Sequence, residues 1–389
     1  MVDRVGGMTR RRMLGLAGGA ACASASPQWL RGQAGVAVNH SVENASDTLR
    51  AHAMAKELLT GCAVVPSLLD KDEAYTRLVK EQANILVAEN AMKWGPLRPS
   101  PTTFDFDEAD RLVEFAEANG MQVRGHNLCW HRQIPKWFDG VATTGNAKEL
   151  LAGHIETVAG RYAGKMHSWD VVNEAIELKD GRPDGLRISP WLKLIGGEYI
   201  ELAFRAARQA DPRALLTYND YGIEAEDKAS EAKRAAVLRL LRWLKQRHVP
   251  IDALGVQSHI QARRMGDRDT GLTYGKGLMQ MIAEVRGMGM QVFVTEMDVN
   301  DRHLGPAVVE RDQAVAETYE RYLETVLRDP AVKAVLTWGI TDKYTWLNGE
   351  DSRADKVPER PLPFDREYQA KQAFFAMREA YDRRPLRGV

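Results

Sequence analysis

The chain of 389 residues has little of several features that would identify a protein class directly. It contains three cysteines, its aromatic content is 7%, and its 53 basic residues equal its 53 acidic residues. This balance of charge gives no reason to expect nucleic acid or a strongly charged surface as a partner. Because 44% of the residues are hydrophobic, we expect a soluble globular protein with a large core, suited to a neutral ligand.

Motifs for the common nucleotide and zinc sites are also missing. The first predicted strand, at residues 61–65, is followed by neither a GxGxxG pattern nor a P-loop, which disfavours a doubly wound sheet. The chain has no HExxH, and the same strand has no His-x-His pair, which disfavours a metal-dependent barrel hydrolase. We therefore expect neither a metal nor an organic cofactor.

The amino terminus resembles a bacterial twin-arginine export signal. Consecutive arginines in residues 9–14 precede an apolar, Gly/Ala-rich run at 14–23, which ends on Ala23-Ser24-Ala25. This run is too short to remain in a bilayer as a spanning helix. We expect residues 1–25 to be removed on export to the periplasm or the medium, with a disordered tail as the alternative, and residues 26–47 to form a linker.

The cysteines agree with export but decide little. Cys22 lies inside the expected signal, so Cys62 and Cys129 remain, each within a strand-like run. Buried free thiols are the preferred interpretation, and a disulfide between the two is the alternative.

Strand-like and helical patterns alternate along the rest of the chain. The eight predicted strands lie at residues 61–65, 85–92, 122–130, 167–175, 214–221, 253–260, 291–299 and 334–341. The predicted helices lie at residues 48–60, 107–120, 198–211, 228–247 and 312–329. Because no linker-like segment interrupts residues 48–384, the pattern predicts an α/β protein with one (β/α)8 TIM-barrel catalytic domain, followed by a short tail at 385–389.

Two of the predicted strands end on a glutamate. WDVVNEAIE at 169–177 carries Glu174, and FVTEMDV at 293–299 carries Glu296. In a barrel of parallel strands, both carboxylates would reach the same rim. A pair of carboxylates can break a glycosidic bond, because one gives a proton to the leaving oxygen while the other supports the anomeric carbon.

Motifs on nearly every predicted strand resemble those of glycoside hydrolase family 10, the endo-β-1,4-xylanase family. The motifs that carry the resemblance are ENAMKW at 89–94, GHNLCWHRQIPKW at 125–137, WDVVNEA at 169–175, GVQSHI at 255–260, VTEMDV at 294–299, WGITDKYTWL at 338–347 and RPLPFD at 360–365. The resemblance covers about residues 48–384. It implies a retaining double displacement with Glu174 as acid/base and Glu296 as nucleophile.

The resemblance also implies roles for neighbouring side chains. His259 is expected to donate to Glu296, Asp298 to orient His259, and Asn173 to bind the sugar 2-hydroxyl. The residues expected to contact the sugar chain are Glu89, Asn90, Lys93, His126, Trp130, Gln257, Trp338 and Trp346. Bulk at Trp346 implies a preference for xylan over cellulose. The alternatives are that Lys93 only pairs with Glu89 and that Trp130 is an ordinary core residue.

The expected activity is hydrolysis of internal bonds in xylan by a monomer that binds neither nucleic acid nor, once mature, a membrane. One alternative is a related retaining barrel glycosidase that acts on short xylo-oligosaccharides, aryl glycosides or mixed-linkage glucan. Another is a carbohydrate-binding protein on an inactive barrel. The second is disfavoured because both carboxylates and the histidine partner are present.

Overall fold

The computed structural model describes residues 45–262, 274–349 and 352–386. Eight parallel strands close into a barrel, because β1 pairs with both β2 and β9, and β6 pairs with β8. The strands of the barrel are β1 (Leu59–Val64), β2 (Ile85–Ala88), β3 (Gln122–Cys129), β4 (Ser168–Asn173), β5 (Leu215–Asp220), β6 (Ala253–Val256), β8 (Gln291–Asn300) and β9 (Val332–Thr337). The (β/α)8 barrel predicted from the sequence is thus confirmed.

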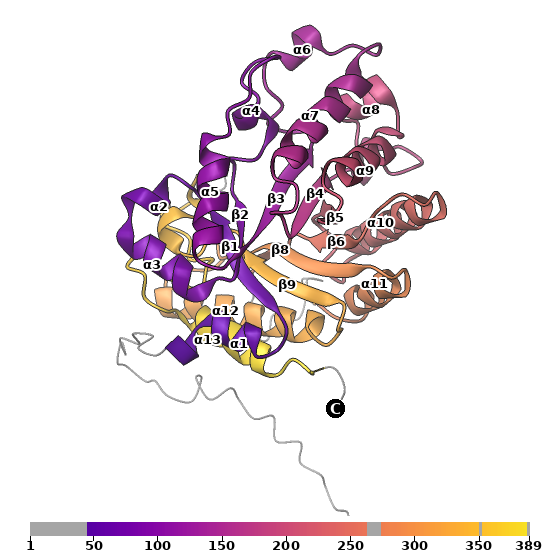
Figure 1. Cartoon of the computed structure of the whole chain (residues 1–389). Coiled ribbons are helices and arrows are strands. Elements are labelled where there is room, and N and C mark those ends of the chain that lie inside the picture. Colours follow the sequence, from indigo (N-terminus) through magenta and orange to yellow (C-terminus); the bar gives the residue numbers. More distant parts are fainter. Residues whose placement is uncertain (1–44, 263–273, 350–351, 387–389) are drawn as a thin grey trace, which may run out of the picture. The chain divides into compact units, whose positions relative to one another are not determined.

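Helices connect successive strands and lie outside the barrel (Figure 1). The longer helices are α3 (Glu73–Gln82), α5 (Asp107–Ala118), α7 (Ala147–Arg161), α9 (Tyr199–Ala210), α10 (Lys228–Gln246), α11 (Lys276–Gly287), α12 (Val308–Val326) and α13 (Gln372–Asp382). The shorter helices are α1 (Leu49–Met54), α2 (Leu68–Lys71), α4 (Trp94–Leu97), α6 (Phe138–Val141) and α8 (Pro190–Ile195). Among the described helices, none combines the length and the apolar character needed to cross a bilayer.

The boundaries of the helices follow from local chemistry. Asp227 caps α10 by accepting hydrogen bonds from the backbone N–H groups of Ala229 and Ser230. The helix at 107–120 ends as predicted, because Gly120 takes the left-handed conformation with φ of 60° directly after α5. Both boundaries are therefore visible in the sequence.

Several predicted boundaries are wrong. The helix predicted at 48–60 ends at Met54, and Leu59 already belongs to β1, where it pairs with Ala334. The strand predicted at 85–92 ends at Ala88, because the chain turns there toward α4. Pairing with a neighbouring strand, which the local pattern does not show, decides each of these ends.

The strand predicted at 253–260 is divided in two. β6 ends at Val256, Ser258 has a positive φ of 64°, and a separate short strand β7 (His259–Gln261) pairs with the end of β8. β8 continues to Asn300, close to the end predicted at 299, so Glu296 lies within this strand and is not its last residue. The break at Ser258 allows His259 to pair with Asp298, two residues beyond Glu296.

One cluster of buried apolar side chains lies among the strands of the barrel. The buried cluster consists of Ala63, Ile85, Val87, Ala253, Phe293, Ala334, Leu336 and Trp338. Cys62 and Cys129 are buried and free, so the preferred interpretation of the cysteines is confirmed. The expected signal at 1–25 and most of the expected linker at 26–47 lie outside the described residues. The described end of the linker, Ala45–Asp47, forms a short 3-10 helix.

Candidate active site

Glu174 and Glu296 reach the carboxyl-terminal rim of the barrel from strands β4 and β8. Glu174 follows the last residue of β4 and has a φ of 58°, in the left-handed region that few non-glycine residues adopt. Its N–H donates to the carbonyl of Asn219 at 2.8 Å, and the N–H of Glu296 donates to the carbonyl of Gln257 at 3.0 Å. The backbone of Glu174 is thus held by β5, and that of Glu296 by the segment that follows β6.

A chain of amide side chains links the two carboxylates. Gln257 Nε2 donates to Glu174 Oε1 at 3.0 Å, and Asn219 Nδ2 donates to Glu296 Oε1 at 2.7 Å. Asn173 Oδ1 accepts from both amides, at 3.3 Å from Gln257 Nε2 and 2.9 Å from Asn219 Nδ2. The distance between the two acids is therefore set by buried hydrogen bonds, which hold the pair in one geometry.

Glycine at position 255 makes room for these amide side chains. A Cβ at Gly255 would lie 2.2 Å from Asn219 Oδ1, far inside van der Waals contact. Asn219 Oδ1 itself accepts from Thr295 at 2.7 Å, which orients the amide so that its nitrogen points to Glu296. Asn219 was not among the predicted site residues. Its position at the end of the run ALLTYNDY was the signal that could have identified it.

Glu296 is held in its ionised form. Burial by itself raises the pKa of the Glu296 carboxyl, but the hydrogen bond from His259 and the charges of His126 and His259 lower it to about 2. His259 Nε2 lies 3.2 Å from Glu296 Oε2, and His259 Nδ1 lies 3.0 Å from Asp298 Oδ2. Burial by itself lowers the pKa of His259, yet Asp298 and Glu296 raise it well above its ordinary value. His259 is therefore a charged donor to Glu296.

The pKa of the Glu174 carboxyl is shifted in the opposite direction. Burial raises the pKa of its carboxyl, and the hydrogen bond from Gln257 only partly opposes this effect. His131 Nδ1 lies 3.8 Å from Glu174 Oε2, but burial and the charge of Arg187 lower the pKa of His131 to about 3. His131 is therefore neutral and does not stabilise the Glu174 anion. The Glu174 carboxyl thus keeps its proton to a higher pH than an ordinary glutamate, while Glu296 stays ionised, an arrangement that suits acid/base work beside a nucleophile.

Three of the predicted sugar contacts form a row of hydrogen bonds beside the two acids. Lys93 Nζ donates to Asn90 Oδ1 at 3.0 Å, and Asn90 Nδ2 donates to Glu89 Oε1 at 3.1 Å. The ammonium of Lys93 also lies 5.1 Å from the ring centre of Trp130 and 5.5 Å from that of Trp338. Burial lowers the pKa of Lys93, while the charges of Glu296, Glu89 and Glu174 oppose that effect. Lys93 is thus coupled to both acids as well as to Glu89.

Trp346 contacts the two residues that lie beside Glu296 in the hydrogen-bond network. Its indole Nε1 donates to Asp298 Oδ2 at 2.8 Å, and its ring meets the His259 ring edge-on at 5.4 Å. Trp346 is 40% exposed, whereas Trp338 is 7% exposed and packs edge-on against His126. The exposed indole presents an apolar surface at the rim, and the buried one forms the floor of the site.

His126 has partners that the sequence did not predict. Its Nδ1 lies 2.9 Å from Asp170 Oδ2 and 3.9 Å from Glu296 Oε1, and Asp170 forms an ion pair with Arg124. His126 is 2% exposed, so its side chain is largely enclosed by these groups. Arg124 and Asp170 are fully buried charges inside strands β3 and β4, and a charge in an apolar run was the available signal.

Within the described part of the chain, one group could offer three ligands to a metal ion. Ligand atoms of His126, Asp170 and Glu296 lie within 4.8 Å of one another. Asp170, however, already pairs with the Arg124 guanidinium, and Glu296 accepts from Asn219 and His259. A divalent cation there would have to compete with these buried donors, so the arrangement suits hydrogen bonding better than metal binding.

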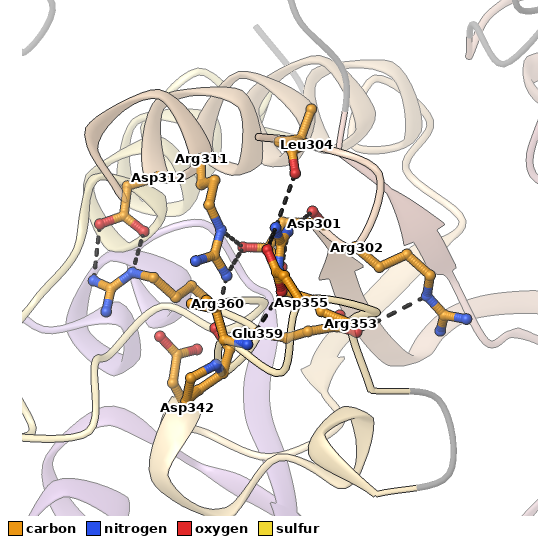
Figure 2. Close-up of polar contacts among 12 residues, drawn as sticks. Asp301, Arg302, Leu304, Arg311, Asp312, Asp342, Arg353, Asp355, Glu359 and Arg360 are labelled. Carbon is orange, nitrogen blue, oxygen red and sulfur yellow. Dashed lines mark hydrogen bonds and ion pairs between the residues drawn. The ribbon is translucent and has the colours of Figure 1, made fainter. Parts of the chain in front are cut away.

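The loop after β9, which carries Trp346, is anchored by buried charges (Figure 2). Arg311 of α12 donates to Asp301 Oδ2 at 2.7 Å and to the carbonyl of Pro358 at 2.7 Å. Arg353 Nη2 donates to the carbonyl of Leu304 at 2.9 Å, and Arg360 pairs with Asp312 through two contacts of 2.7 and 2.8 Å. These bonds connect the end of β8, the start of α12 and the loop that contains Trp346.

Replacing Arg311 by methionine is expected to lower the free energy of unfolding by about 3–5 kcal/mol, because the Asp301 carboxylate would be left buried without its main partner. Urea unfolding measures the change. Arg383→Met is the matched control, since Arg383 pairs with Glu320 and Glu324 but is 45% exposed, and its loss is expected to stay below about 1 kcal/mol. Equal losses in the two variants would contradict a stabilising role for the buried cluster.

Comparison with known proteins identifies the family of the chain. The family model described as glycosyl hydrolase family 10 matches residues 48–380. Endo-1,4-beta-xylanase B of Thermotoga neapolitana is 37% identical over 308 residues, which are 79% of this chain and 83% of that protein. A beta-1,4-xylanase of Dictyoglomus thermophilum is 36% identical over 312 residues, covering 77% of this chain and 83% of the relative.

A solved structure shows the same fold. Xylanase 10B of Thermotoga petrophila RKU-1, solved in complex with xylobiose, superposes with a TM-score of 0.76 at 34% identity, covering 86% of this chain and 97% of that chain. The residues that match the family model, 48–380, include all strands of the barrel and both Glu174 and Glu296. The chain therefore belongs to glycosyl hydrolase family 10.

Proposed function

We propose that this protein is a retaining endo-β-1,4-xylanase that hydrolyses internal bonds of xylan. The observation that carries the proposal is the pair of rim carboxylates with opposite protonation preferences, joined by one chain of amides. The relatives named as xylanases and the xylobiose complex of the solved structure support the choice of substrate.

In the first step, an electron pair of Glu296 forms a bond to the anomeric carbon while the bond from that carbon to the glycosidic oxygen breaks. Glu174 gives its proton to the departing oxygen. In the second step, Glu174, now ionised, takes a proton from water, the water oxygen bonds to the anomeric carbon, and Glu296 leaves. Two displacements at one carbon retain its β-configuration.

The surrounding residues serve these two steps. His259, oriented by Asp298, keeps Glu296 ionised before attack, and Asn173 supplies an amide for the sugar 2-hydroxyl. Glu89, Asn90, Lys93, His126 and Gln257 offer polar groups for the other hydroxyls, while Trp130, Trp338 and Trp346 offer ring surfaces. The resemblance to the xylanase family favours xylan over cellulose, because in that family bulk at the position of Trp346 leaves little room for the hydroxymethyl group of glucose.

Time-resolved hydrolysis of xylan tests the proposal. Early release of short oligomers whose new reducing ends are in the β-configuration is expected, because internal cutting by double displacement produces both features. Chromatography of the products measures their size, and NMR measures the anomeric configuration before it equilibrates. Steady release of xylose from chain ends, or products first formed in the α-configuration, would refute an internal-cutting, retaining enzyme.

We also propose that the protein is exported with its amino-terminal twin-arginine segment, which lies outside the described residues. The proposal is supported by the consecutive arginines in residues 9–14, the apolar run at 14–23 and the Ala23-Ser24-Ala25 segment. Sequencing the amino terminus of the protein recovered outside the cytoplasm tests it, since cleavage after Ala25 would leave Ser26 first. Recovery of only the uncleaved chain, inside the cytoplasm, would contradict export.

A further inference from the structure

The acid Glu174 has an unusual backbone that a neighbouring arginine holds in place. Its φ of 58° lies in the left-handed region, a conformation that is unfavourable for a non-glycine residue unless its surroundings stabilise it. Arg187 Nε donates to the carbonyl of Glu174 at 2.8 Å, and the N–H of Arg187 donates to the carbonyl of Ala175 at 2.7 Å. Arg187 therefore binds the backbone on the carboxyl-terminal side of the acid.

The guanidinium of Arg187 is itself fixed by other groups. Its Nη2 donates to Tyr221 Oη at 3.0 Å and lies 3.5 Å from Glu177 Oε2. The Tyr221 ring is in turn covered by the ammonium of Lys233 at 3.7 Å, and Lys233 pairs with the buried Asp220 at 2.8 Å. The side chain of Arg187 is 13% exposed. Such a network fixes the direction of the donated hydrogen bond, and with it the position of the Glu174 carbonyl.

Arg187 acts on one acid of the pair. The side chains that hold the Glu296 carboxylate are Asn219 and His259, and those that orient them are Thr295 and Asp298. Arg187 lies with Glu174, Trp130 and His131 around a small hollow on the other side of the site. A change at Arg187 should thus alter the delivery of the proton and leave the attack by Glu296 largely intact.

We propose that Arg187 is a positioning residue that holds the Glu174 carboxyl in line with the leaving oxygen through the carbonyl of Glu174. The inference rests on the proposed function, because it assumes that Glu174 is the proton donor. Proton transfer is sensitive to geometry, since donor and acceptor must come within hydrogen-bond reach. Without the guanidinium, the backbone at Glu174 would relax from its left-handed conformation. The Glu174 carboxyl would then move out of line with the leaving oxygen.

Two substrates separate proton delivery from nucleophilic attack. Xylopentaose has a sugar leaving group that needs the proton, whereas 2,4-dinitrophenyl β-xylobioside has a leaving group that departs as its anion. In the full chain, Arg187→Met is expected to lower kcat/KM on xylopentaose by about ten- to a hundredfold, a part of the full general-acid effect. On the dinitrophenyl substrate, the loss is expected to stay below about threefold. Since kcat/KM reports the first bond cleavage, slow hydrolysis of the intermediate does not obscure the comparison.

A lysine variant separates position from charge. Arg187→Lys keeps a cation near Glu174 but cannot donate to the carbonyl and to Tyr221 with the same planar group. It is expected to lower kcat/KM on xylopentaose selectively while leaving the basic limb of the pH profile where it is in the wild type. Arg187→Met removes the cation, so the pKa of Glu174 should rise and the basic limb should move to higher pH.

Arg208→Met is the matched control. Arg208 donates to the carbonyls of Pro212 and Ala214 at 2.8 and 3.0 Å and pairs with Asp252, at the opposite end of strand β5 from the site. Any loss of activity in this variant should be equal on the two substrates, and thermal melting compares its stability with that of the Arg187 variants.

The outcomes separate the inference from the function on which it rests. Equal losses on both substrates, or no loss, in a folded Arg187 variant would overturn the positioning role while wild-type activity still supports the proposed function. If Arg187→Met does not fold, the losses of kcat/KM on the two substrates are compared for Arg187→Lys instead, and the same criterion applies. Wild-type protein that cleaves neither substrate would refute the proposed function instead.

Discussion

Replacing Glu296 by glutamine is expected to lower kcat/KM by about 10⁴-fold or more on xylo-oligosaccharides and on dinitrophenyl xylobioside alike. Glutamine keeps the shape and can still accept from Asn219, but its amide cannot form the covalent bond to the anomeric carbon. Because the nucleophile attacks whatever the leaving group, the loss should not depend on the substrate. Initial rates on both substrates measure it.

Glu317→Gln provides the control for this experiment. Glu317 is also a buried glutamate, 6% exposed on α12, and it accepts from Gln313 and Arg321 far from the proposed chemistry. Its replacement should change kcat/KM by less than about twofold, as expected for a residue outside the site. A loss of less than about a hundredfold in Glu296→Gln would contradict the role of nucleophile. Azide should rescue Glu296→Gly by forming the α-glycosyl azide, the product of a single inversion.

Replacing Glu174 by glutamine is expected to have a selective effect. On xylopentaose, kcat/KM should fall by about 10²–10⁴-fold, whereas cleavage of the dinitrophenyl substrate should change by less than about tenfold. The reason is that only the sugar leaving group needs a proton. Hydrolysis of the covalent intermediate should also slow, because no base activates the water, so a burst of dinitrophenolate is expected in rapid-mixing measurements.

The pH profile provides a second measurement of the same role. Glu296, with a pKa of about 2, is ionised across the working range, so the activity of the wild type on xylopentaose should be lost as pH rises through the raised pKa of Glu174. This basic limb should be absent in Glu174→Gln when the dinitrophenyl substrate is used. An equal loss on both substrates, or an unchanged basic limb, would argue against Glu174 as the acid.

The two acids show how one fold shifts the pKa of the same chemical group in opposite directions. Glu296 is buried and the Glu174 side chain is 12% exposed, and burial raises the pKa of both carboxyls. The difference comes from their neighbours, because Glu296 accepts from charged His259, while Glu174 faces neutral His131 and the uncharged amide of Gln257. The carboxyl at position 174 thus favours the proton, and the one at position 296 favours the charge.

The sequence alone predicted the barrel and the strand ends from which the polar side chains arise. These features are local, because a short stretch of neighbouring residues indicates a buried strand, an amphipathic helix or a glycine stop such as Gly120. The motifs around Glu174 and Glu296 identified the family from short stretches of sequence in the same way. The roles assigned to individual side chains remain predictions that the variants above test.

Tertiary structure alone decided how the residues of the site are connected. Asn219 meets Glu296 across 77 residues of sequence, Gln257 meets Glu174 across 83, and the ion pair of Arg124 and Asp170 behind His126 spans 46. The break at Ser258 likewise depends on pairing between strands. Local propensity carries no information about which distant partner satisfies a buried polar group. The closure of the barrel brings these partners together, and burial then requires that each be paired.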